Sequence, residues 1–229
     1  MDITLSYIDK GEGYPFILLH GNGESEEYFK HQIDYFSKQY RVIAIDTRGH
    51  GESKRGSKPF TLEQFAEDLK DFLDGLKITK AIILGFSDGG NIALLFTLKY
   101  PKYVEKLILN GANLHPSGVK NRVQLPIYIG YGMVSLISKV NKKVVVKKEI
   151  LALMVHQPNI QKEELLEITV PTLVIAGKND MIKQGHTEMI AEYIKNSRLC
   201  IIKGDHFIAN KNSQLFNEKV SQFLLNEKD

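Results

Sequence analysis

Cysteine is nearly absent from this chain of 229 residues, which contains only Cys200. A single cysteine cannot form an internal disulfide, and it rules out zinc sites of the CxxC kind. Cys200 lies in the apolar segment RLCIIKG, residues 198–204. The thiol is therefore predicted to be buried in a strand and not to be a catalytic nucleophile.

Long apolar runs and a large excess of one charge are also missing. No run approaches the roughly 20 residues of a membrane span, and the polar start MDITLSYIDKGEG does not look like a secretory signal. The 30 basic residues exceed the 27 acidic residues by only three. The densest basic cluster, residues 141–149, is predicted to be a solvated helix face. We expect a cytoplasmic protein that binds neither membranes nor nucleic acids.

What the chain does have is a regular alternation of short apolar runs and amphipathic stretches. The apolar runs are rich in Ile, Leu and Val and end in Gly, Asn or Asp; examples are PFILLHG, RVIAIDTRG, KAIILGFS and VPTLVIAGKND. Such runs predict strands covered on both faces, whereas the alternating ITLSYID predicts an antiparallel edge strand. The stretches between them predict helices, one with a capping box of Thr61 and Gln64. Together they predict an α/β fold, with a mostly parallel central sheet and helices on both faces.

The alternation stops between residues 115 and 158. This part shows no clear strand, and its apolar stretches are interrupted by Gly and Pro. It predicts two or three helices inserted over the strand ends, with ordinary crossover helices as the alternative. The expected division is an α/β core of residues 1–114 and 159–229 and a short helical cap of residues 115–158.

The segment GFSDG, residues 85–89, fits the pattern G-x-S-x-G between a predicted strand and a predicted helix. In that context the pattern is typical of a sharp turn that presents a serine, here Ser87, as a nucleophile. The flanking glycines, Gly85 and Gly89, are small because the strand and the helix would otherwise collide. A serine that only begins the helix is the alternative interpretation.

A serine nucleophile requires a base and a group that orients the base. Asp180 and His206 each follow a predicted parallel strand, at the edge where such sheets place their sites. Asp205 adjoins His206 and cannot easily reach the far ring nitrogen, so Asp180 is the predicted acid. The predicted oxyanion hole consists of the backbone N–H groups of Asn22 and Asp88.

The segments HGNG, DTRGHGES, GFSDGG, PTLVIAGKND and GDHF together resemble the α/β-hydrolase superfamily, over nearly the whole chain. GFSDGG and KYPKYVEKLILNGAN are most similar to its valacyclovir-hydrolase (biphenyl hydrolase-like) group. The resemblance implies an eight-stranded, mostly parallel sheet with a cap after the sixth strand, and this chain is expected to lack the first strand. Acyl transfer by the predicted triad needs no cofactor and no metal.

The resemblance bears on further side chains. Substrates of the related group include amino-acid esters, which suggests that the Asp88 carboxylate binds a substrate ammonium group; a helix N-terminal acid is the alternative. Asp46, Arg48 and His50 are implied to build a structural turn, not a second acid–base set. The candidates for an acyl pocket in the cap are Tyr128, Tyr131, Met133 and Met154, with simple core packing as the alternative.

These features predict a serine hydrolase, a carboxylesterase that cleaves a small ester through an acyl-enzyme as a monomer or homodimer. The same triad on a C–C, amide or thioester bond is an alternative, and so is a low-turnover protein that binds a small signal molecule or a partner. The serine nucleophile and the absence of tryptophan argue against haloalkane dehalogenation, given what the resemblance implies.

Overall fold

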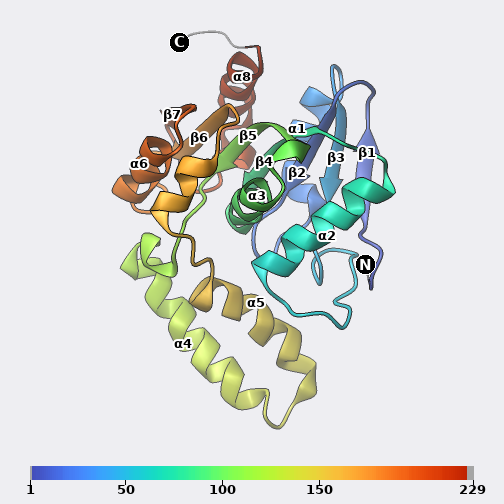
Figure 1. Cartoon of the computed structure of the whole chain (residues 1–229). Coiled ribbons are helices and arrows are strands. Elements are labelled where there is room, and N and C mark those ends of the chain that lie inside the picture. Colours follow the sequence, from blue (N-terminus) through green and yellow to red (C-terminus); the bar gives the residue numbers. More distant parts are fainter. Residues whose placement is uncertain (1, 226–229) are drawn as a thin grey trace.

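The computed structural model describes residues 2–225, and within them seven strands form one sheet (Figure 1). The order across the sheet is β1-β3-β2-β4-β5-β6-β7. Only β1 is antiparallel to its neighbour, and all other pairs are parallel. The strands are β1 (Tyr7–Lys10), β2 (Pro15–Leu19), β3 (Arg41–Ile45), β4 (Ala81–Phe86), β5 (Val104–Asn110), β6 (Thr172–Gly177) and β7 (Ser197–Ile202).

Helices cover both faces of this sheet, as the sequence predicts. Side chains alternate along a strand, so Ile17 and Leu19 of β2 join the core on one face while Phe16 and Leu18 join the core on the other. The first core includes side chains of α2 (Leu62–Gly75), α3 (Asp88–Lys99) and α6 (Gln184–Tyr193). The second includes those of α1 (Lys30–Phe36), α7 (Ile208–Lys211) and α8 (Ser213–Leu224). Three short 3-10 helices, η1 (Glu26–Phe29), η2 (Pro101–Tyr103) and η5 (Lys162–Glu167), lie in connections of this core.

The described residues form seven strands, which agrees with an eight-stranded fold that lacks its first strand. One expectation for the sheet needs correction. Strand β7 was expected to be covered on both faces, but it is the edge strand, and its Leu199 and Ile201 are exposed. For the same reason Cys200 is half-buried, so the prediction of a buried thiol is wrong.

The cap helices α4 (Asn121–Ile137) and α5 (Val145–His156) lie between β5 and β6 and form a hairpin that projects from the core (Figure 1). The 3-10 helices η3 (Pro116–Gly118) and η4 (Lys142–Val144) precede α4 and α5. The sequence predicts helix breaks at Gly and Pro, but α4 continues through Pro126 without a break. The two cap helices are hydrogen-bonded to each other, since Gln124 Nε2 of α4 donates to the Met154 carbonyl of α5 at 2.9 Å.

The two ends of the cap segment lie next to each other where they join the core. The backbone N–H of Ile160 donates to the carbonyl of Leu114 at 3.0 Å, so the two ends of the excursion are hydrogen-bonded to each other. None of the helices in residues 2–225 has both the length and the apolar character needed to cross a membrane.

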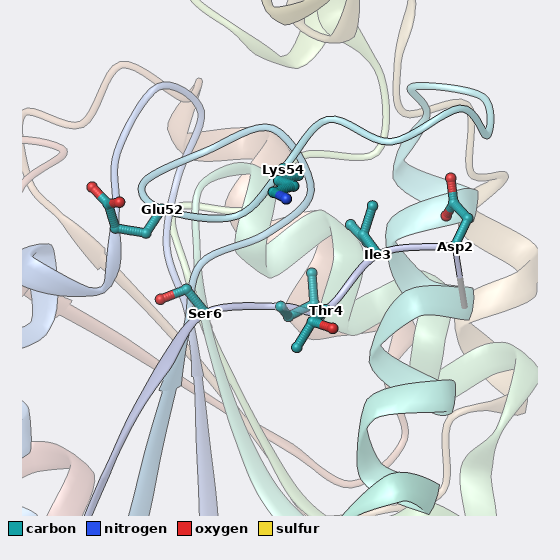
Figure 2. A pocket seen from close by; sticks show the side chains of 7 residues that line it. Asp2, Ile3, Thr4, Ser6, Glu52 and Lys54 are labelled. Atoms are coloured by element: carbon teal, nitrogen blue, oxygen red, sulfur yellow. The ribbon is translucent and has the colours of Figure 1, made fainter.

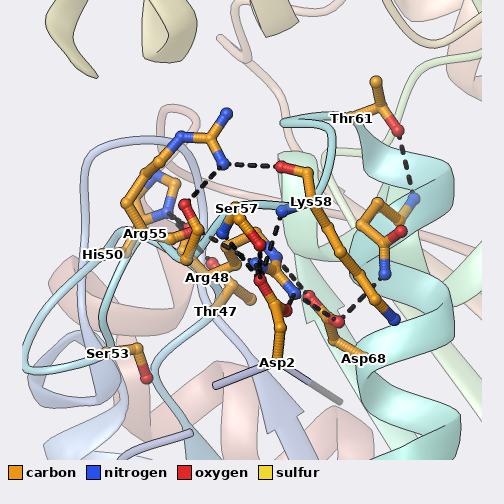
Figure 3. A network of polar contacts seen from close by, with 12 residues as sticks. Asp2, Thr47, Arg48, His50, Ser53, Arg55, Ser57, Lys58, Thr61 and Asp68 are labelled. Atoms are coloured by element: carbon orange, nitrogen blue, oxygen red, sulfur yellow. Dashed lines mark hydrogen bonds and ion pairs between the residues drawn. The ribbon is translucent and has the colours of Figure 1, made fainter. Parts of the chain in front are cut away.

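The DTRGHGES turn is a buried polar network in the core (Figure 3). The Arg48 side chain is fully buried and forms a bidentate pair with Asp68, at 2.6 Å from Nε and 2.8 Å from Nη2. Asp2, near the N-terminus, is a second carboxylate partner at 2.6 Å. Arg48 therefore ties the turn to helix α2 and to the N-terminal segment, as expected of a structural turn.

Replacing Arg48 by Met is expected to lower the free energy of unfolding by about 3–5 kcal/mol, because it leaves the Asp68 carboxylate buried without its cation. Urea denaturation followed by circular dichroism measures the change. Arg41→Met is the matched control, since Arg41 forms a comparable pair with Asp9 that is about one third exposed. This control is expected to cost less than about 1 kcal/mol. Equal losses in the two variants would contradict the role of the buried pair.

A pair of carboxyl groups lies at the start of the same turn. The backbone N–H groups of Glu26 and Glu52 donate to the Asp46 carboxylate, both at 2.9 Å. The hydrogen bond of the Glu26 carboxyl group to Asp46, together with burial, raises the pKa of Glu26 to about 7. The folded state thus holds a proton on Glu26 that the unfolded chain loses at a lower pH.

Because the pKa of Glu26 is raised in the folded state, its contribution to stability is present at low pH and is lost as the pH rises through about 7. Glu26→Gln mimics the protonated side chain. The variant is therefore expected to gain thermal stability relative to the wild type as the pH rises from about 5 to about 8. Calorimetric melting temperatures across this range provide the test, and a difference that does not change with pH would refute the shared proton.

Candidate active site

Ser87 occupies a strained turn between β4 and α3. Its backbone has φ 53° and ψ −120°, in the left-handed half of conformational space that residues with a side chain rarely adopt. The crowding around the turn explains its glycines. A Cβ on Gly85 would lie 2.2 Å from the Gly89 carbonyl oxygen, and a Cβ on Gly89 would lie 2.0 Å from that of Leu19. The predicted nucleophile therefore sits on the sharp turn that its pattern indicates.

His206 and Asp180 are brought together from the loops after β7 and β6. His206 Nδ1 lies 2.7 Å from Asp180 Oδ1, and both residues are buried. The same Oδ1 accepts the backbone N–H of Ile182 at 2.9 Å, which fixes the carboxylate. A Cβ on Gly111 would lie 2.7 Å from His206 Cε1, so the loop after β5 needs a glycine where the imidazole passes.

The second ring nitrogen of His206, Nε2, can act as a base. Because Nδ1 faces a carboxylate, the neutral ring carries its proton on Nδ1 and leaves the lone pair on Nε2. His206 Nε2 is buried and has no hydrogen-bond partner among residues 2–225. The ring packs against Phe86, which precedes Ser87, with 4.8 Å between ring centroids. This geometry offers a base beside the strained turn.

The loop after β2 is ordered by His20. The backbone N–H of Thr47 donates to His20 Nε2 at 3.1 Å, so Nδ1 carries the proton and donates to the Gly21 carbonyl at 2.7 Å. Burial, together with His50, lowers the pKa of His20 to about 4, which keeps the ring neutral. A Cβ on Gly21 would lie 3.1 Å from that of Ser87, so this loop runs directly beside the predicted nucleophile.

The Asp88 carboxylate is engaged by two amide groups, a feature that the sequence did not predict. Asn22 Nδ2 donates to Asp88 Oδ2 at 2.8 Å, and Asn91 Nδ2 donates to Oδ1 at 3.1 Å. Asp88 is only 8 % exposed, and burial raises the pKa of its carboxyl group. As the first residue of α3, Asp88 has one of the backbone N–H groups that a helix leaves without an internal partner.

The cap reaches this site through helix α5. Asn22 Nδ2 also donates to the carbonyl of Ile150 at 3.0 Å, and Glu149 pairs with Arg55 of the core at 2.6 Å. Lys120, at the start of α4, donates from Nζ to the Asp180 carbonyl at 2.5 Å. The cap is thus attached both to the loop after β2 and to the loop that carries Asp180.

The cap residues that are predicted to line an acyl pocket have different surroundings in the structure. Tyr128 lines a groove with Pro116, Ser117 and other residues at the base of α4, and Met133 is 59 % exposed on α4. Tyr131 packs edge-on against His156, with 5.2 Å between centroids. The role of these residues and of Met154 stays a prediction.

Sequence reasoning missed Tyr28, which no motif marks. Its ring stacks on Phe86 with 4.2 Å between centroids, and its buried hydroxyl group has no hydrogen-bond partner among residues 2–225. Burial raises the pKa of this hydroxyl group, and so do the charges of Glu24 and Asp180. Tyr28 therefore forms part of the wall next to the predicted triad.

Another concave region of the surface lies away from the candidate catalytic residues. A surface groove of about 580 Å³ is lined by the extended N-terminal segment and by Glu52 and Lys54 (Figure 2). Its lining includes none of the candidate catalytic residues. Nowhere in residues 2–225 do three or more His, Cys, Asp or Glu side chains gather in a way that could hold a metal ion.

Comparison with known proteins agrees with the fold. Serine hydrolase BPHL of Homo sapiens is 30 % identical over 97 % of this chain and 83 % of its own. The putative carbamate hydrolase RutD of Azorhizobium caulinodans is 26 % identical over 97 % of this chain and 95 % of its own. The crystal structure of the enol-lactonase from Burkholderia xenovorans superposes with a TM-score of 0.82 at 22 % identity, covering 97 % of each chain, and shows likeness of fold alone.

A family model described as alpha/beta hydrolase fold matches residues 14–132. This match carries the strand, turn and helix around Ser87 and reaches into the cap. Together with the full-length relative, it confirms the resemblance that the motifs indicate. The chain belongs to the alpha/beta hydrolase fold family.

Proposed function

We propose that this protein is a serine hydrolase that cleaves a small carboxylic ester with Ser87, His206 and Asp180. The observation that carries the proposal is the 2.7 Å contact between His206 Nδ1 and Asp180 Oδ1, with His206 Nε2 left unpartnered close to the strained turn of Ser87. The relative that is 30 % identical over nearly the whole chain is named a serine hydrolase, which supports the same chemistry.

The proposed reaction has two steps. His206 Nε2 takes the hydroxyl proton of Ser87 as Oγ attacks the ester carbonyl, and Asp180 stabilises the imidazolium that forms. The backbone N–H groups of Asn22 and Asp88 hold the developing oxyanion. His206 then gives the proton to the leaving alcohol. In the second step His206 Nε2 removes a proton from water, whose oxygen attacks the acyl carbonyl. The bond to Ser87 Oγ then breaks, Oγ takes the proton back from His206, and the acid is released.

In this proposal the Asp88 carboxylate positions the oxyanion loop. Two amide groups already donate to it and Asp88 is only 8 % exposed, so a substrate ammonium group has little access to the carboxylate. The Asn22 side chain that bridges Asp88 and the Ile150 carbonyl would hold the loop beside Ser87 and join it to the cap. Asn22 would thus act through its side chain as well as through its backbone.

Ser87→Ala is expected to lower kcat on p-nitrophenyl esters by about 10⁴- to 10⁶-fold, because the acyl-enzyme can no longer form. A series from acetate to octanoate measures the rate and sizes the acyl pocket. Ser57→Ala, which changes an exposed serine whose Oγ donates to Asp2 and to none of the three triad residues, serves as the control. A folded wild-type protein that turns over no ester would contradict the esterase proposal and favour a C–C, amide or thioester substrate or a binding role.

Asn22→Ala is expected to lower kcat by about 10- to 100-fold with little change in KM, because a displaced oxyanion loop weakens only the transition state. Asn22→Asp should lose more, since it sets a second carboxylate against Asp88. Steady-state kinetics on the preferred ester tests both variants. Asp88→Asn adds a further test with amino-acid esters: a selective loss of these substrates would mean that the carboxylate binds their amine and does not merely position the loop.

A further inference from the structure

The end of the cap hairpin exposes apolar side chains that nothing in residues 2–225 covers. We define the cap tip as residues 136–148, which include the end of α4, the turn and the start of α5 and lie at the far end of the projecting hairpin (Figure 1). Val140 is 90 % exposed and Leu136 is 66 % exposed. Ile137, Val145 and Val146 are exposed as well. So many apolar groups on one small surface mark a site of interaction.

The apolar surface continues along one side of α4. Leu125, Ile129 and Met133 are each more than half exposed and follow one another at intervals of four residues, so they form a row that runs toward the cap tip. The opposite side of α4 packs on α5. The exposed row is therefore a second apolar face of the helix, not a frayed edge of the core.

The cap tip is also strongly basic. It contains five lysines, namely Lys139, Lys142, Lys143, Lys147 and Lys148, and no acidic residue. The whole segment 115–158 has seven basic residues and one acidic residue, Glu149, which is paired with Arg55. Its formal charge is +6, whereas the full chain has +3, so the rest of the chain has −3. The positive charge of the protein is thus concentrated on the cap.

We propose that the cap tip docks on the surface of an anionic phospholipid membrane. Apolar side chains that enter the boundary of the acyl chains, surrounded by lysines that meet acidic headgroups, are the combination that holds a peripheral protein on such a surface. The proposal departs from the expectation of no membrane contact, which rested on reading residues 141–149 as a solvated helix face. A solvated face does not explain exposed Val140, Val145 and Val146 between the lysines.

A second copy of the chain fits the same surface less well. In a two-fold symmetric contact the same patch would face itself. Two cap tips, each with five lysines and no acid, would then repel each other, whereas a membrane supplies opposite charge. Charge complementarity therefore selects the anionic lipid surface.

Flotation of the full chain with lipid vesicles tests the proposal. Binding is expected to vesicles of phosphatidylcholine with about 30 % phosphatidylserine, to be absent with phosphatidylcholine alone, and to be released by high salt. The variant Lys142→Gln/Lys143→Gln should bind about 25-fold more weakly, at about fivefold for each lysine near the surface. Leu136→Gln/Val140→Gln, which leaves the charge unchanged, should also lose binding.

The matched control is Lys30→Gln/Lys38→Gln, which removes two exposed lysines outside the cap. It should bind like the wild type, and circular dichroism should show all variants folded. The proposal is overturned if the wild type ignores acidic vesicles, or if the control loses as much binding as the cap-tip lysine variant. Light scattering measures the oligomeric state and can also overturn the proposal. If the wild type is a dimer, and Leu136→Gln/Val140→Gln converts it to a monomer without changing vesicle binding, the surface is an interface between two copies of the chain.

Discussion

The close crossing of strand β4 and helix α3 is the constraint on which the candidate site depends. Backbone atoms approach so tightly that no Cβ fits at Gly85 or Gly89, and the chain between them can turn only by forcing Ser87 to a positive φ. Such strain persists only where the surrounding structure over-determines it. Here β2 and β5 provide that support as the neighbours of β4 on either side. The result is a hydroxyl group presented at the edge of a rigid sheet.

Each loop around this turn is held in place by a different set of hydrogen bonds. His20 stays neutral and uses both ring nitrogens to tie the loop after β2 to Thr47. Asp180 is held by a backbone N–H group and faces His206. Asp88 gathers two amide groups. His20, Asp88 and Asp180 are buried, and each is hydrogen-bonded to the protein, so the geometry needs little rearrangement to meet a substrate. Preorganisation of this kind is what electrostatic stabilisation of a transition state requires.

Much of this could be predicted from local sequence. Ser87, Asp180 and His206 each follow an apolar run that predicts a parallel strand, and because parallel strands end at one edge of a sheet, their order along the chain is enough to bring them together. The Arg48 turn was implied by the resemblance to the α/β hydrolases, and the cap helices were indicated by the absence of a clear strand between residues 115 and 158. The pairing of Asn22 with Asp88 was not, because it joins residues 66 positions apart through side-chain orientations that no pattern encodes.

Other features escaped prediction because they depend on neighbours. The composition of β7 is that of a buried strand, yet its place at the edge of the sheet exposes Leu199. Helix α4 continues through Pro126, although proline removes a backbone hydrogen bond from a helix interior, so the local sequence wrongly indicates a break there. The sequence places valines among the lysines of the cap tip, but their exposure follows only from the projection of the hairpin away from the core (Figure 1).

The hydrogen bond between Ile160 and Leu114 has a consequence for how this cap can vary. Because the excursion begins and ends at one closed point, the core experiences the cap mainly as a loop whose ends are already joined. Closure entropy grows only with the logarithm of length, so even a doubling of the insertion would cost about 0.6 kcal/mol. Insertions or deletions toward the cap tip, beyond the contacts of Lys120, Glu149 and Ile150 with the core, can therefore accumulate with little effect on the stability of the sheet. The outer part of the hairpin is thus free to diverge while the triad geometry is retained.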